Sequence, residues 1–266
     1  MGQVRMMDLA DLRAFLEDCP PPAPSDLTQS SGDESDLPYE YELDDLYHLY
    51  STVRRTSCVS VLEFGSGWST VVLALALHEN AESFGDEHRR LVRHPNPFQI
   101  LTIDASGHWQ EVALSRLPAW LKSTVRGVSC NVNLVDRYGS YVHLYEKVPE
   151  FVADLIYLDG PDPEQVHGAI NGFEYSELHT LPMGADILRI EPHLWPGTMI
   201  ITDGRTANAR FLAAHLRRNW QVIHDPFGDR TTFRLEETSF GPVIEKHLST
   251  RLIAARELRD KEGPNS

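Results

Sequence analysis

Residues 59–77 read Val-Ser-Val-Leu-Glu-Phe-Gly-Ser-Gly-Trp-Ser-Thr-Val-Val-Leu-Ala-Leu-Ala-Leu, which joins an apolar strand, a turn with two glycines and an apolar helix. The strand ends near Glu63, and the turn holds Gly65 and Gly67. Glycines let a ligand approach the backbone at the beginning of a helix, where N–H groups lack partners. This stretch therefore predicts a binding site for a nucleotide-type cofactor.

The remainder of the chain alternates apolar, strand-like runs with helical patterns. This alternation is typical of an open parallel sheet covered by helices. Two short strands near the end, 220–224 and 231–235, flank a turn and predict an antiparallel hairpin. We therefore expect an α/β fold with a doubly wound, mostly parallel seven-stranded sheet. The other expected strands cover 59–64, 99–104, 128–135, 153–158 and 197–202, and the expected helices cover 68–79, 108–121, 164–180, 184–194 and 205–218.

The two ends of the chain differ from its middle. Asp8 is placed to cap a short helix with Leu12 and Leu16 on one face, and residues 20–38 have the Pro, Ser and acidic composition of a flexible linker. The expected parts are an N-terminal helix and acidic linker (1–42), a Rossmann-like domain (43–240), and a C-terminal helix and tail (241–266).

Composition restricts the class of protein. The 266 residues are 41% hydrophobic, enough for a sizeable core. Twelve of the 39 acidic residues lie in residues 1–50, and no broad basic surface is expected, so we predict neither nucleic acid nor membrane as a partner. Three widely spaced cysteines without metal-ligand spacing, and the absence of a secretory or membrane-spanning pattern, predict a cytoplasmic protein. The oligomeric state cannot be read from the sequence.

Three more expected strands also end in an acid. Glu63 is followed in this pattern by Asp104, Asp159 and Asp203. The carboxyl ends of parallel strands share one edge, so the four carboxylates should line one crevice. The alternative is that each acid only caps the helix that follows it. Asp104 lies further from the glycine turn than is usual, and an inserted loop at 82–98 would account for the excess.

Together these motifs resemble those of the class I S-adenosylmethionine-dependent methyltransferases, over residues 43–236. Residues 63–67 look like the first motif of that family, Asp104 like its ribose-binding acid, and residues 154–160 like its fourth motif. Residues 195–203 are similar to the segment that leads into its fifth strand. The resemblance implies a methyltransferase-type Rossmann-like fold, S-adenosylmethionine as cofactor, and methyl transfer to an oxygen or nitrogen of a small-molecule acceptor.

Two departures from the family pattern bear on the site. Ser69 stands at the usual third glycine. The Asp-Asn pair that metal-dependent O-methyltransferases show after the fifth strand reads Asp203-Gly204 here. The second departure leaves the need for a divalent metal open, and no metal ligands are assigned.

The chemistry of the cofactor suits an acid-lined crevice, since its sulfonium and ammonium outweigh its one carboxylate. That carboxylate would meet backbone N–H groups of the glycine loop, Glu63 would face the ammonium, and Asp104 would accept the ribose hydroxyls. The expected cofactor-binding residues are Glu63, Gly65, Ser66, Gly67, Ser69, Thr70, Asp104 and Asp159.

Few residues are candidates for removing a proton from the acceptor. Asp159 and Asp203 could orient or deprotonate a hydroxyl, or hold a divalent ion together. His167 is a candidate general base, as is His193, although a lone histidine is more often a surface or packing residue. Arg205 could bind an acidic acceptor, with a salt bridge or a solvated helix start as the alternative.

Two rival functions remain open at this point. A nicotinamide-dependent oxidoreductase would also use the glycine turn and Asp104, but its motif requires a glycine where Thr70 stands. A non-catalytic binding or scaffold module would keep the fold and use the acidic N-terminal extension. The locally basic loop 82–98 could act as a lid, or be ordinary solvated surface.

Overall fold

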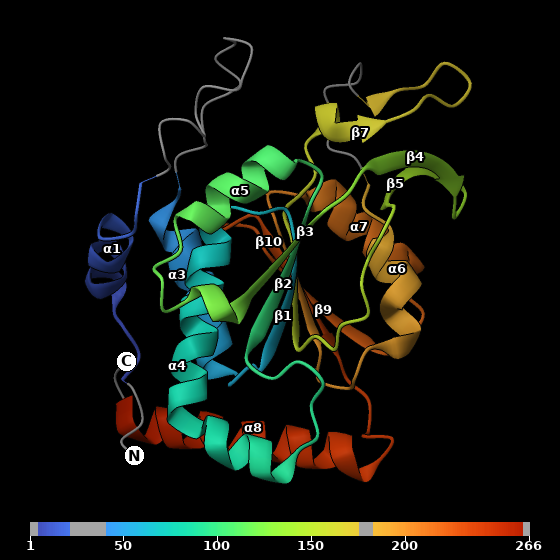
Figure 1. Ribbon diagram of the computed structural model, residues 1–266. Helices are drawn as coiled ribbons and strands as arrows, with labels where there is room; N and C mark the ends of the chain where they lie inside the picture. The colour runs from blue at the N-terminus through green and yellow to red at the C-terminus, as the bar shows by residue number, and fades with distance from the viewer. Residues whose placement is uncertain (1–4, 22–40, 176–182, 263–266) are drawn as a thin grey trace.

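Two β-sheets organise the molecule, which is seen in Figure 1 as a computed structural model that describes residues 5–21, 41–175 and 183–262. The strands are β1 (Ser60–Phe64), β2 (Gln99–Asp104), β3 (Val125–Ser129), β4 (Val132–Arg137), β5 (Ser140–Tyr145), β6 (Leu155–Leu158), β7 (Val166–His167), β8 (Met199–Asp203), β9 (Trp220–Asp225) and β10 (Arg230–Leu235). The large sheet has the order β3-β2-β1-β6-β8-β10-β9, and the small one the order β5-β4-β7.

The order of the large sheet defines where a ligand would bind. Strands β3, β2, β1, β6 and β8 are parallel, and β10 is antiparallel to both of its neighbours. The chain proceeds from β1 to β2 and β3 on one side, then crosses to β6 and β8 on the other. In such doubly wound sheets the ligand crevice lies at the carboxyl ends of the strands where the order reverses, here between β1 and β6. The expected fold class, including the terminal hairpin, is confirmed.

Helices cover both faces of the large sheet (Figure 1). None of the described helices is long and apolar enough to cross a membrane. The first helix begins at its predicted cap, where Asp8 Oδ1 accepts the backbone N–H of Asp11 at 2.9 Å. The helices are α1 (Leu9–Glu17), α3 (Leu43–Arg55), α4 (Trp68–Leu91), α5 (Gly107–Ser115), α6 (Asp186–Ile190), α7 (Thr206–His215) and α8 (Pro242–Glu262).

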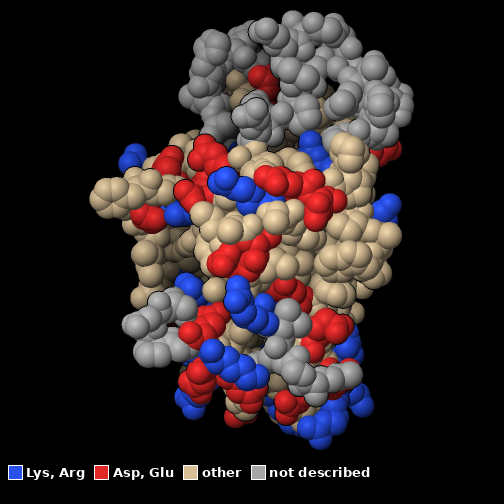
Figure 2. Space-filling view, turned by 90° about the vertical axis from the view of Figure 1, so that its left-hand side faces the viewer, with Lys and Arg blue, Asp and Glu red and all other residues tan. Residues whose placement is uncertain are grey.

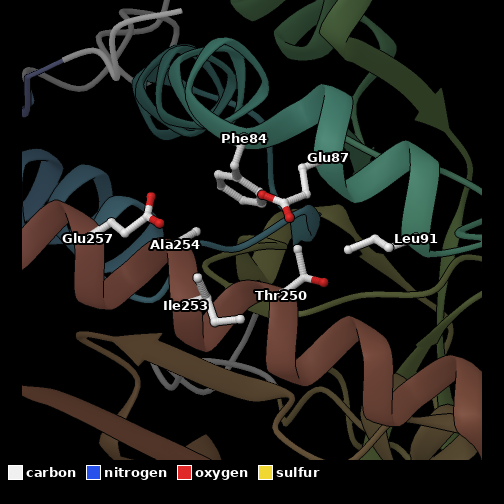
Figure 3. A pocket seen from close by; sticks show the side chains of 7 residues that line it. All are labelled: Phe84, Glu87, Leu91, Thr250, Ile253, Ala254 and Glu257. Carbon is white, nitrogen blue, oxygen red and sulfur yellow. The ribbon is translucent and has the colours of Figure 1, made fainter.

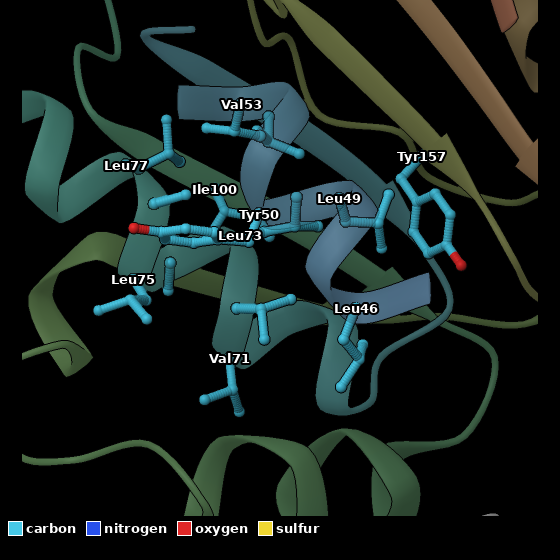
Figure 4. Packing of buried hydrophobic residues seen from close by; sticks show 14 of the residues in the cluster. Leu46, Leu49, Tyr50, Val53, Val71, Leu73, Leu75, Leu77, Ile100 and Tyr157 are labelled. Atoms are coloured by element: carbon cyan, nitrogen blue, oxygen red, sulfur yellow. The ribbon is translucent and has the colours of Figure 1, made fainter. Parts of the chain in front are cut away.

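Alternating side chains of the parallel strands build two apolar cores. Val61 of β1 packs with α3 and α4, whereas Leu62 and Phe64 pack on the opposite face with α6 and α7. Figure 4 shows the first core, in which Leu46 of α3 and Leu73 of α4 belong to the same cluster. Burial on both faces explains why Val61, Leu62 and Phe64 of β1 are apolar in close succession, which made the strand recognisable in the sequence.

The predicted loop 82–98 is wrong over most of its length, because α4 continues to Leu91. The extension is stabilised by packing: Phe84 lies 5.4 Å from Phe98 between ring centroids and contacts the same small core as Ala254 of α8. The segment therefore lies at the end of α4 that is remote from the glycine turn. It cannot serve as the lid that its basic composition allowed.

The predicted third strand, 128–135, is in fact divided between two sheets. Strand β3 ends at Ser129, and the chain makes its last bond to the large sheet where Cys130 N–H donates to the carbonyl of Asp104 at 3.1 Å. It then enters the small sheet as β4, which pairs with β5. A continuous β-type pattern conceals this exchange of sheets.

The helix predicted at 164–180 is absent from residues 164–175. Gly168, Asn171 and Gly172 have φ values of +100°, +53° and +80°, which a right-handed helix does not accommodate. A short 3₁₀ turn and β7 stand in its place. The remainder of that prediction, like most of the predicted linker 20–38, lies outside the described residues.

The remaining predicted helices are present with different bounds. Helix α5 is shorter than 108–121, and the segment 184–194 forms α6 followed by a 3₁₀ turn. The C-terminal segment forms α8 up to Glu262. The division of the chain at residues 42 and 240 stays a prediction.

Candidate functional site

The glycine turn between β1 and α4 is held by hydrogen bonds to its neighbours. Gly65 has a φ of +95°, and its N–H donates to the carbonyl of Ile103 at 2.8 Å. The N–H of Ser66 donates to Asp104 Oδ2 at 2.6 Å, and that of Gly67 to Thr70 Oγ1 at 3.1 Å. The N–H groups of residues 65–67 are therefore used internally. The first N–H groups of α4, at positions 68 and 69, are those left for a ligand carboxylate, since they have no partner within a helix.

Glu63 lies beneath this turn and is completely buried. Its Oε2 accepts the hydroxyl of Thr70 at 2.6 Å, whereas Oε1 has no hydrogen-bond partner among the described residues. Burial raises the pKa of Glu63 to about 7, and the nearby hydroxyls of Thr70, Ser69 and Thr102 oppose that rise. A buried carboxylate with an unpaired oxygen is a costly arrangement unless a donor or cation completes it.

Asp104 connects the end of β2 to two loops. Its Oδ2 accepts the N–H of Ser66 at 2.6 Å, and its Oδ1 accepts the N–H of Ser106 at 2.7 Å. Burial raises its pKa, and these two hydrogen bonds oppose the rise. Asp104 thus shapes the glycine turn directly, in addition to any contact with a ribose. A carboxylate has about four acceptor positions, so both oxygens retain capacity for hydroxyl donors.

Asp159 is the electrostatic centre of the site. The negative charge of Asp159 raises the pKa of Glu63 and of Asp203. The charge of Asp104 in turn raises the pKa of Asp159. Burial among protein atoms is the main cause of its raised pKa, although the side chain stays accessible to solvent. A side chain that is accessible to solvent but closely surrounded by protein atoms lies in a recess. The four strand ends lie at one edge of the sheet, as the parallel order predicts, but Glu63 is enclosed beneath the turn, and the roles of the four acids stay predictions.

Asp203 ends β8 and is half-buried. Burial raises its pKa to about 7, and the charges of Asp45 and Asp159 act in the same direction. Asp45, from the first turn of α3, is held by Arg230 of β10 at 3.1 Å. The amino end of α3 therefore adds a carboxylate to the edge of the site that the sequence analysis did not anticipate.

Arg205 is not the solvated residue that the sequence analysis considered as one alternative, and its contact with an acidic acceptor stays a prediction. Its guanidinium is buried and donates to the carbonyl of Asp159 and, at 2.9 Å, to that of Pro161. It binds two backbone carbonyls of the turn after β6 and forms no side-chain salt bridge with another described residue. We conclude that Arg205 positions the turn that carries Asp159. Its location directly after Asp203-Gly204 gave no sign of this contact.

Asp162 is a further acid that the sequence analysis missed. Burial raises its pKa, and the charge of Arg205 opposes the rise. Asp162 in turn raises the pKa of Asp104 and of Asp159. Its position three residues after Asp159 was the available signal, but only the turn of the chain at Gly160 shows that it faces the same recess.

Neither of the two predicted histidine bases contacts the four acids within the described residues. His167 is exposed in β7, paired with Asn133 of β4 in the small sheet, and no contact among the described residues joins it to the four acids. His193 is exposed in the turn before β8, whereas Asp203 ends that strand, so the strand separates them. His193 is thus at the wrong edge of the sheet, and His167 stays an untested candidate.

A shallow pocket between α4 and α8 is separate from this site (Figure 3). It lies beside Phe84, sixteen residues along α4 from Trp68, which corresponds to about 24 Å of helix. Within the described ranges, no group of three or more His, Cys, Asp or Glu side chains is placed to hold a metal ion. The pocket is lined by Phe84, Glu87, Leu91, Thr250, Ile253, Ala254 and Glu257.

Comparison with known proteins gives structural likeness only. No protein-family model and no curated protein sequence matches the chain. Among solved structures, the SAM complex of the O-methyltransferase TomG from Streptomyces achromogenes is 16% identical with a TM-score of 0.43, covering 79% of this chain and 93% of that one. An SAH-bound methyltransferase from Podospora anserina is 17% identical with a TM-score of 0.43, covering 89% and 100%. A methyltransferase from Geobacter sulfurreducens is 16% identical with a TM-score of 0.42, covering 88% and 100%. The fold assignment rests on the chain's own topology.

Proposed function

We propose that this protein is an S-adenosylmethionine-dependent methyltransferase that acts on an oxygen or nitrogen of a small-molecule acceptor. The observation that carries the proposal is the electrostatic contact of Asp159 with Glu63, Asp104 and Asp203 beside a glycine turn, at the point where the strand order reverses. A recess lined by carboxylates favours a ligand with net positive charge and disfavours a pyrophosphate. This preference separates the proposal from a nicotinamide cofactor.

The residues of the turn fit the cofactor. The Glu63 carboxylate lies enclosed directly beneath the turn, where its charge favours an ammonium bound above it, and the first N–H groups of α4 are left for the carboxylate. Asp104 retains acceptor capacity for ribose hydroxyls. When bound, the cofactor supplies the reactive methyl carbon, activated by the sulfonium. The protein then has to orient the acceptor in line and remove its proton.

Asp159 and Asp203 are the groups placed for proton removal. Burial, with the charges of Asp45 and Asp159, raises the pKa of Asp203 to about 7. Burial, with the charges of Asp162 and Asp104, raises the pKa of Asp159. A base with a pKa near the working pH is both sufficiently ionised and sufficiently basic. We assign these two carboxylates to the acceptor, with Arg205 holding the turn that positions Asp159.

A ligand-binding experiment tests the proposal. S-adenosylhomocysteine is expected to raise the melting temperature, and NAD is expected to have no effect. At 100 times its dissociation constant, the ligand should stabilise the folded protein by about 2.7 kcal/mol. Asp104→Ala should abolish the shift while circular dichroism stays unchanged, whereas Asp136→Ala, on an exposed part of β4, should keep it. A shift with NAD alone would support the oxidoreductase alternative.

Turnover distinguishes an enzyme from a binding module. Asp203→Asn should bind S-adenosylhomocysteine as the wild type does and lose methyl transfer to any acceptor found in a screen of hydroxyl and amine compounds. Asp159→Asn should lose methyl transfer as well. Activity that survives a chelator would show that no divalent metal is needed. Cofactor binding without turnover on any acceptor would favour the scaffold alternative.

The surface charges and the cysteines bear on the partners and the cellular location that we propose. On the face that carries α1, acidic and basic side chains are interspersed among the coloured residues of Figure 2, which does not suit binding along a nucleic-acid backbone. All three cysteines are free, and burial raises the pKa of the Cys19 and Cys58 thiols to about 11. We propose a cytoplasmic protein that binds neither nucleic acid nor membrane.

A further inference from the structure

Strand β9 forms one edge of the large sheet and is open on both faces. Among the described strands, β10 is its one neighbour. Val222 and Ile223 point to opposite faces of the sheet, yet they are 45% and 57% exposed. At the tip of the same hairpin, Phe227 is fully exposed. Trp220 packs against the core, but the described helices leave Val222 and Ile223 uncovered.

The backbone of β9 presents a row of free groups outward. Leu235 of β10 faces β8, since its N–H donates to Thr198 and its carbonyl accepts from Gly197, both at 2.9 Å. Neighbouring residues of a strand face opposite sides, so Thr232 faces β9 and bonds with Ile223 opposite it. The N–H and C=O groups of Val222 and His224 therefore point away from the sheet. No described residue pairs with them.

The strand lacks the features that usually protect an edge. Proteins block exposed edges with proline, inward charges, bulges or a covering loop. The six residues of β9 contain no proline or lysine, and their pairing with β10 runs without a bulge. Proline appears only at position 226, in the turn after the strand. An unprotected edge of this length is suited to pairing with another strand.

We infer that β9 pairs antiparallel with β9 of a second copy of this chain, joining two sheets across a twofold axis near Ile223. Such an axis places the beginning of each strand beside the end of the other. The exposed Arg217, six residues before the axis, then lies towards the exposed Asp229 of the other copy, six residues after it; Asp225 is already paired with Arg230 of its own chain. The edge is thus complementary in charge to itself. Val222, Ile223 and Phe227 of both copies lose exposure together.

The symmetry also explains why assembly stops at two copies. Each chain has one β9 edge, and the twofold pairing uses both edges, so no further chain can be added there. The opposite edge of the sheet is β3, which does not take part. Since a single strand pair is a small interface, the dimer should dissociate on dilution.

Sedimentation of the full chain over a range of concentrations tests this inference. The wild type should show a monomer–dimer equilibrium. Val222→Pro removes an outward N–H without removing a bond to β10, so it should weaken dimerisation about tenfold or more with little change in melting temperature. Ile253→Lys, a change at an equally exposed apolar residue of α8, should leave the dimer intact.

A charge-exchange experiment tests the axis itself. Ile223→Lys and Ile223→Glu should each be monomeric, because like charges would face each other across the axis, and an equimolar mixture of the two should dimerise. A monomeric wild type would overturn the inference and leave the edge for a strand of another protein. A dimer that survives Val222→Pro and Ile223→Lys would overturn it as well, since its interface would lie elsewhere.

Discussion

Gly65 and Gly160 touch each other across the ends of β1 and β6. A Cβ added to Gly65 would lie 2.7 Å from the backbone nitrogen of Gly160, and one added to Gly160 would lie 2.7 Å from the Cα of Gly65. Each distance is shorter than real contacts of a Cβ atom. The two turns of the site can therefore approach each other only because both residues are glycine.

Gly160→Ala should destabilise the protein by about 1–3 kcal/mol, because the new methyl group overlaps backbone that cannot move without displacing Glu63 or Asp159. Urea unfolding measures this change. Gly107→Ala is the matched control, since its Cβ would meet nothing nearer than 3.6 Å in the first turn of α5. Equal stability of the two variants would show that the two turns are further apart than described.

The affinity for S-adenosylhomocysteine should rise with pH through neutrality. Burial raises the pKa of Glu63 to about 7, and the ionised form is the one that binds an ammonium. About a tenth of the sites are ionised at pH 6 and about nine tenths at pH 8, so the affinity should rise about tenfold and then level off. Titration calorimetry at several pH values measures this. Glu63→Gln should bind weakly at every pH, whereas Asp203→Asn should keep the wild-type dependence.

Arg205→Lys should lower turnover more than cofactor affinity. A lysine supplies one point charge where the guanidinium reaches the carbonyls of both Asp159 and Pro161, so the turn that carries Asp159 loses a fixed partner. We expect a loss of about 1–3 kcal/mol in stability and a marked decrease in kcat. Arg210→Lys, at an exposed position of α7, is the control. Unchanged kcat in Arg205→Lys would remove its positioning role.

Much of the fold could be predicted because buried parallel strands carry a local signal. Strands β1, β2, β6 and β8 are short, largely apolar runs. Strands β2 and β8 end in an acid, Glu63 is the last residue but one of β1, and Asp159 directly follows β6. The small sheet could not be predicted, since β4 pairs with β7 across a long stretch of chain. The length of α4 was missed for a similar reason: its last turns are stabilised by α8, far away in sequence.

The candidate site, like the fold, could be predicted from the sequence only in part. The sequence indicated the four acids, because a parallel sheet places strand ends together whatever the side chains do. It gave no sign of Arg205 binding the turn after β6, or of Asp45 facing Asp203 from α3. Those contacts depend on how separate elements approach one another. The roles assigned to individual residues stay predictions until binding and turnover are measured.

A buried network at the opposite edge of the sheet should make the protein sensitive to acid. His247 Nε2 and Arg251 Nη1 of α8 each lie 2.7 Å from Asp154 Oδ1, and His247 Nδ1 lies 3.0 Å from His88 Nε2 of α4. Burial lowers the pKa of His88 to about 3 and that of the adjacent His94 to about 4, whereas the charges of Arg251 and His247 hold the pKa of Asp154 below its usual range.

The sign of the effect follows from these directions. The folded pKa values of both histidines lie below the ordinary 6.5, so the unfolded chain binds more protons, and the free energy of unfolding falls as the pH decreases from about 6.5 towards 4. Each histidine contributes up to about 1.4 kcal/mol per pH unit in that range. Buried carboxyls with raised pKa values, such as Glu63, act oppositely, so variants must be compared with the wild type.

Urea unfolding at pH 7, 6 and 5 measures the effect. The free energy of unfolding should decrease less for His88→Gln than for the wild type and for His193→Gln, a change at an exposed histidine. Parallel decreases in all three proteins would contradict this account, since the titrating groups would then lie outside the network.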